Sequence, residues 1–175
     1  MQDLMDMALR LGAKKATVIA AELIVLSAEF RKICQSNGCG MYDRCWMCPP
    51  HVGDIEALMA QVQTYRHGLL YQTIGELEDS FDIEGMFDAG RSHAQLSQRI
   101  EKSGMLPENH LHLTCGGCRL CERCAKRDGE PCRFPQDALP SMEAYGIDVY
   151  NTTKNTPLKY INGTNTVTFF GIVLF

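Results

Sequence analysis

Hydrophobic residues recur at helical spacing in three parts of the chain. The predicted helices cover residues 3–11, 54–65 and 80–102. Gly12 follows the first helix and favours the left-handed turn that ends many helices, and Asp54 is a suitable N-cap for the second. The third helix is amphipathic, with Phe87 and Leu96 on the apolar stripe that we expect to be buried.

Four other segments are rich in β-branched or apolar residues and predict strands. They cover residues 16–26, where one or two strands fit, 69–74, 111–114 and 166–175. The last segment, TVTFFGIVLF, becomes wholly apolar, which is typical of a central strand buried on both faces. We therefore expect a single layered domain over residues 1–175, of the α/β or α+β class, with a central sheet.

The charge of the chain argues against two classes of partner. It has 17 Lys and Arg against 21 Asp and Glu, a net charge of −4, so no basic field favours nucleic acid or an anionic membrane. The longest apolar run, residues 16–26, is far shorter than the roughly 20 residues that cross a bilayer. The first ten residues lack the charged start and apolar core of a secretory signal, so we expect a cytoplasmic protein.

Cysteine is the unusual feature of the composition. The chain has nine cysteines, although 175 residues can bury a hydrophobic core without cross-links. In a reducing compartment such cysteines more often bind metal or carry out redox chemistry than form disulfides. They fall into two predicted loops, at about residues 34–51 and 115–135. Both loops are candidate metal-binding sites.

The second loop, CGGCRLCERCAKRDGEPCRFP, carries the clearest ligand pattern. Its cysteines are spaced by three residues and then by eight: Cys115, Cys118, Cys121, Cys124 and Cys132. Two-residue spacers let the backbone turn around an iron–sulfur cluster and direct successive thiolates to different irons. A structural zinc site usually draws one cysteine pair from each of two turns, which is a different pattern. The spacing therefore favours a [4Fe–4S] cluster, with zinc as the alternative.

The first loop, CQSNGCGMYDRCWMCPPHVG, could hold a second metal site. It contains Cys34, Cys39, Cys45 and Cys48, followed by His51. Four cysteines suffice for a cluster, and three would suffice with His51 or an external group as the fourth ligand. Histidine near a metal more often orients a ligand than binds the metal itself. We therefore expect His51 beside the site, with direct ligation as the alternative.

Two longer patterns carry a resemblance to a known family. They are R-x-x-C-x4-C-G-x-Y-x3-W-x-C-P-P-x-V-G and C-R-L-C-E-x-C-x7-C-R-F-P, the second followed by S-M-E-A-x-G-I-D-V. Together they resemble the predicted metal-binding proteins of domain of unknown function 2284. The resemblance implies a cysteine-ligated metal or iron–sulfur site in prokaryotes, often anaerobes, with no established reaction.

The resemblance also implies a set of ligands. The matching cysteines are Cys34, Cys39, Cys48, Cys118, Cys121, Cys124 and Cys132. Cys45 and Cys115 depart from the pattern and stay as further candidates, together with His51. Seven thiolates would fill one cluster and leave a second with one open or non-cysteine position. The partition between one or two clusters stays open, because Cys132 could also complete the first group.

Three functions fit these residues. The leading one is an iron–sulfur electron carrier that serves a redox partner protein. The second is an enzyme whose open iron binds a substrate or cofactor, and the third is a binding module stabilised by zinc. Glu143 lies within the family pattern but has no predicted chemical role. The histidines outside the loops have none either, and we expect them on the surface or in strands.

Overall fold

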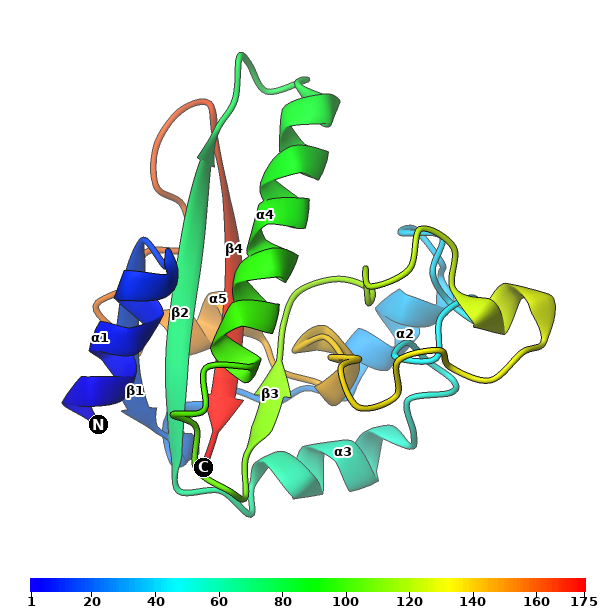
Figure 1. Ribbon diagram of the computed structural model, residues 1–175, viewed down its shortest axis with the longest axis horizontal. Coiled ribbons are helices and arrows are strands. Elements are labelled where there is room, and N and C mark those ends of the chain that lie inside the picture. Colours follow the sequence, from blue (N-terminus) through cyan, green and yellow to red (C-terminus); the bar gives the residue numbers. More distant parts are fainter.

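A computed structural model describes all 175 residues of the chain. A four-stranded antiparallel sheet forms the centre of the fold (Figure 1). Its strands are β1 (Lys15–Ala20), β2 (His67–Glu76), β3 (Leu111–Leu113) and β4 (Thr166–Leu174), in the order β1-β2-β4-β3. The C-terminal strand is therefore central, as its apolar sequence predicts. Because every strand pair is antiparallel, the layered fold with a central sheet is of the α+β class.

Helices and turns cover both faces of the sheet. The helices are α1 (Gln2–Leu11), α2 (Glu29–Gln35), α3 (Ile55–Val62), α4 (Ile83–Glu101) and α5 (Val149–Thr153). In Figure 1, α1 and α4 lie in front of the sheet and α5 lies behind it. Side chains alternate between the two faces along β2. Leu69 and Tyr71 pack with α1 and α4, whereas Leu70 packs with the segments on the opposite face.

The predicted helix boundaries match local chemistry. Gly12 ends α1 with φ at 119°, in the left-handed region. Asp54 caps α3 by accepting hydrogen bonds from the backbone N–H groups of Glu56 and Ala57. The helix ends at Val62, three residues earlier than predicted.

Two sequence-based expectations about side chains were wrong. Phe87 is 54% exposed, because its side of α4 faces the cysteine-rich loops across a groove instead of the sheet. His93, expected on the surface or in a strand, is fully buried in α4, the helix that packs against β2. The apolar run at residues 16–26 forms only β1, because residues 21–23 turn as a 3-10 helix after the strand.

The two cysteine-rich loops lie side by side at one edge of the sheet, on the side away from α1 (Figure 1). The first loop follows α2, and the second follows β3, so the sheet and the adjoining helix set their relative position. The chain contains no helix with the length and apolar character needed to span a membrane.

Candidate metal centre

Five cysteines from the two loops line one small apolar cavity. They are Cys45, Cys118, Cys121, Cys124 and Cys132. The remaining lining residues are also apolar and include Trp46 and Phe134. Cys45 therefore joins the cysteines of the second loop, although in sequence it lies among those of the first. All nine cysteines are free thiols.

Trp46 forms one wall of this first cavity. Its indole N–H donates a hydrogen bond to the backbone oxygen of Glu130, at 3.0 Å, and so joins the two loops. The ammonium group of Lys126 lies 5.4 Å from the centre of the Trp46 ring on its outer side, close enough for a cation–π contact. An apolar wall of this kind excludes water from the sulfur atoms inside.

The other three cysteines of the predicted ligand set line a second, larger cavity of about 310 Å³. They are Cys34, Cys39 and Cys48, all from the first loop or the end of α2. Unlike the first cavity, this one has polar residues among its lining, including Ser141 and Glu143. The Oε2 atom of Glu143 is buried and has no hydrogen-bond partner, and burial raises the pKa of this carboxyl group.

The two loops approach each other closely at Gly117. A Cβ atom there would lie 3.5 Å from the sulfur of Cys48 and 3.0 Å from the Cε atom of Met41, so a glycine allows this close approach. Cys45 lines the first cavity and Cys48, three residues further along the chain, lines the second. The interaction between these two thiols lowers the pKa of Cys45 and, with burial, raises the pKa of Cys48.

Burial governs the acidity of other thiols in the two cavities. It raises the pKa of Cys118 to about 11 and also raises the pKa of Cys34. A buried thiol of this kind stays protonated unless a cation stabilises its thiolate. Metal binding at these cysteines would therefore release protons and strengthen as the pH rises.

Two of the candidate ligands lie outside both cavities. Cys115 lines neither of them, and burial raises its pKa to about 12. The Nε2 atom of His51 is 2.6 Å from a carboxylate oxygen of Asp43, and its ring packs edge-on against Trp46. The imidazole thus contacts other residues of the first loop from outside both cavities.

The donor atoms decide which kind of metal fits. The first cavity offers sulfur only, and the second offers sulfur and one carboxylate oxygen. By donor type alone, thiolates suit both zinc and iron–sulfur clusters. No three His, Cys, Asp or Glu side chains stand close enough together to hold a single metal ion.

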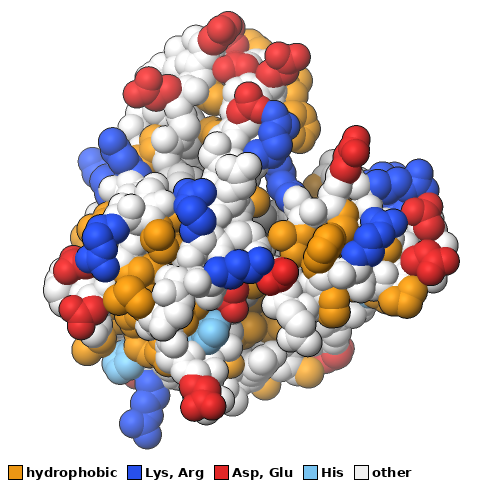
Figure 2. Space-filling model, viewed as in Figure 1, with side chains coloured by type: hydrophobic (Ala, Val, Ile, Leu, Met, Phe, Trp, Pro, Cys, Tyr) orange, Lys and Arg blue, Asp and Glu red, His pale blue; other side chains and the backbone are white.

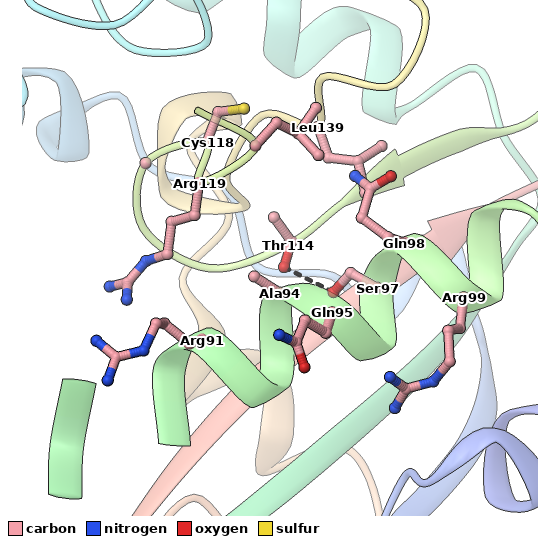
Figure 3. Close-up of a pocket in the computed structure, with 12 residues that line it drawn as sticks. Arg91, Ala94, Gln95, Ser97, Gln98, Arg99, Thr114, Cys118, Arg119 and Leu139 are labelled. Carbon is pink, nitrogen blue, oxygen red and sulfur yellow. Dashed lines mark hydrogen bonds between the residues drawn. The ribbon is translucent and has the colours of Figure 1, made fainter. Parts of the chain in front are cut away.

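A buried polar network connects the sheet to the second loop. The hydroxyl of Tyr71 lies 2.7 Å from Ser97 Oγ and 2.8 Å from His112 Nε2. Ser97 in turn bonds Thr114, the residue before the second loop, at 2.9 Å (Figure 3), and His112 bonds Glu101 at 2.9 Å. These bonds fix the base of the loop against α4. Sequence analysis missed them because the five residues lie on different elements.

A groove separates α4 from the second loop. Figure 2 shows this hollow, and Figure 3 shows Arg91 of α4 and Arg119 of the loop extending toward the same opening. Arg119 packs over Gly90, where a Cβ atom would lie 3.1 Å from its guanidinium. The groove also reaches Cys39 and Cys118, one from each cavity, so it gives solvent access to both sets of cysteines.

Fold and site together define a cysteine-rich α+β protein of the metal-binding class, with two sets of thiols gathered from two loops. The chain belongs to the family described as Predicted metal-binding protein (DUF2284), whose pattern matches residues 17–175. The two cysteine patterns in the sequence therefore identified the family correctly. No curated protein and no solved structure matches the chain.

Proposed function

We propose that the protein is an iron–sulfur protein that holds [4Fe–4S] clusters in its two cysteine-lined cavities and passes single electrons to a partner protein. The observation that supports this proposal best is the convergence of five cysteines from two loops on one apolar cavity. A bound cluster supplies reversible one-electron transfer, with a potential set by hydrogen bonds, charge and burial.

The chain divides its cysteines unequally between the two clusters. The first cavity has five cysteines for four irons, and Cys45, which departs from the family pattern, is the spare thiol in this proposal. The second cavity has Cys34, Cys39 and Cys48 and needs a fourth ligand of another kind. Cys132 goes with the first cavity under this assignment, since it lies there beside Cys121 and Cys124.

The charge on the loop surface supports an acidic partner protein. Arg44, Arg123, Lys126 and Arg127 line a shallow surface cavity that contains one acid, Asp43. Complementary charge speeds the encounter of two proteins and orients them. Arg44 and Arg123 are next in the chain to Cys45 and Cys124, which line the first cavity, so a partner that docks here would approach the first cluster closely.

The free state of all nine thiols supports work in a reducing compartment. We propose the cytoplasm, and an organism that keeps the clusters from oxygen. Exposure to oxygen would oxidise and break down clusters of this kind, so the protein has to be purified without oxygen for any measurement of its clusters.

One observation favours a second function, catalysis at the second cluster. Its cavity, of about 310 Å³, is larger than the first and has polar residues in its lining, and its three cysteines leave one iron without a thiolate. Such an iron can act as a Lewis acid toward a substrate oxygen. In that case Ser141 and Glu143 would lie beside the substrate and orient it.

The test is a measurement of metal and colour on protein purified without oxygen. Iron and acid-labile sulfide in near-equal amounts, with broad brown absorption, are expected. Colourless protein that contains zinc and no sulfide would refute the proposal and favour a zinc-stabilised binding module.

Single cysteine variants show which thiols bind. Cys118→Ser should lose the absorption of one cluster, because this residue lines the first cavity. Cys115→Ser is the matched control, since it lies in the same loop and lines neither cavity, and it should keep its full iron content. Equal iron in Cys118→Ser and the unsubstituted protein would contradict the ligand assignment.

A further inference from the structure

A buried carboxylate oxygen without a hydrogen-bond partner is rare, and Glu143 Oε2 is such an atom. Glu143 lines the same cavity as Cys34, Cys39 and Cys48. We propose that Glu143 is the fourth ligand of the second cluster and binds, through a carboxylate oxygen, the iron that has no thiolate. This inference rests on the proposed function, because it requires a cluster in the second cavity.

Local structure holds Glu143 at this position. It begins the 3-10 turn Glu143–Tyr145, and the turn closes at Gly146 with φ at 75°. The Ser141 hydroxyl accepts a hydrogen bond from the Ala144 N–H at 3.1 Å. The N–H of Met142 donates to the Thr114 oxygen at 2.8 Å, which fixes the turn beside the base of the second loop. The carboxylate is thus carried by a backbone with little freedom to move.

Arg31 ties this turn to the helix that carries Cys34. Its guanidinium donates hydrogen bonds to the backbone oxygens of Gly53, at 2.8 Å, and Ala144, at 3.4 Å. One side chain therefore spans α2, the end of the first loop and the turn of Glu143. This contact restrains the position of Glu143 relative to Cys34, as two ligands of one cluster require.

The energetics also favour a bound cation at Glu143. A buried carboxylate oxygen without a hydrogen-bond partner is unfavourable, and more so when the group is charged. Two nitrogens of the Arg31 guanidinium donate to backbone oxygens, its Nε has no partner, and Arg31 forms no ion pair with Glu143. An iron in the second cavity would supply the missing positive charge.

An oxygen ligand gives the second cluster a property that the first lacks. Carboxylates are harder donors than thiolates and bind iron–sulfur iron less strongly. Glu143 would therefore hold the fourth iron in the resting protein and leave when a competing oxygen ligand arrives from the open side of the cavity. The first cavity, with sulfur donors only, has no such exchangeable position.

The experiment compares Glu143→Gln and Glu143→Cys with Glu130→Gln, a control at an exposed acid of the second loop. Each protein is purified without oxygen and its iron, sulfide and electron paramagnetic resonance spectrum are measured after mild ferricyanide oxidation. Glu143→Gln should lose about one iron per chain and show the signal of a three-iron cluster. Glu143→Cys should keep all its iron, lack that signal and have a lower reduction potential, because thiolate is the stronger donor.

The outcomes separate this inference from the proposed function. If the unsubstituted protein and Glu130→Gln contain no iron and sulfide, both ideas are wrong. If they do contain clusters, and Glu143→Gln matches them in iron content and resonance spectrum, the ligand role of Glu143 is refuted while the clusters stand. Should Glu143→Gln fail to fold, Glu143→Cys decides: an unchanged reduction potential would overturn the ligand role.

Discussion

Acid should weaken the fold through His93, the buried histidine of α4. Its Nδ1 atom lies 2.9 Å from Thr73 Oγ1, and its ring stacks on Tyr71 with centres 5.5 Å apart. The Nε2 atom is buried without a partner. Burial lowers the pKa of His93 to about 4, from 6.5, and the nearby His112 and Arg119 act in the same direction. The folded protein therefore keeps this imidazole neutral under conditions that protonate it in the unfolded chain.

The sign and size of the effect follow from linkage. Between pH 6.5 and pH 4 the unfolded state binds a proton that the folded state does not, so the free energy of unfolding falls as the pH falls through this window. Each pKa unit is worth about 1.4 kcal/mol. The contribution of His93 is therefore complete above pH 6.5, and about 3 kcal/mol of it is lost by pH 4.

Urea unfolding followed by circular dichroism, from pH 7 to pH 4, measures this loss. His93→Gln removes the titrating group, and its free energy of unfolding should fall less steeply with acid than that of the unsubstituted protein. Thr73→Val is the control, because it removes the hydrogen bond and leaves the imidazole, and its curve should shift without a change of slope. Parallel curves for His93→Gln and the unsubstituted protein would refute the argument.

Two glycines give further predictions with opposite signs. Gly171→Ala should destabilise the protein by about 3 kcal/mol, because a Cβ atom there would overlap the ring and hydroxyl of Tyr71. Two hydrogen bonds hold the Tyr71 hydroxyl in place, so the ring cannot move aside easily. A urea midpoint equal to that of the unsubstituted protein would contradict this. Gly90→Ala should raise the melting temperature, because alanine stabilises a helix by about 1 kcal/mol more than glycine does. The new Cβ atom would lie 3.1 Å from the Arg119 guanidinium, which can move toward the open groove. A lower melting temperature would show that Arg119 is fixed there.

Local signals in the sequence were sufficient for much of the fold. Gly12 and Asp54 mark helix ends through their own backbone and side-chain chemistry, and the fully apolar end of the chain gives the central strand β4. These features depend on neighbours a few residues away. Phe87 shows the limit of such signals, because an apolar position on a helix does not reveal whether the sheet or another loop faces it.

The sequence by itself identified the candidate metal ligands. Cysteine spacing in each loop is a local property, and it placed the chain in its family and defined two candidate ligand groups. Tertiary structure decided how the cysteines divide between cavities. It moved Cys45 to the first cavity and brought Glu143, about a hundred residues from Cys34 and Cys39, to the second. The physical reason is that contacts between distant segments depend on how the sheet and helices pack, and local spacing carries no record of that packing.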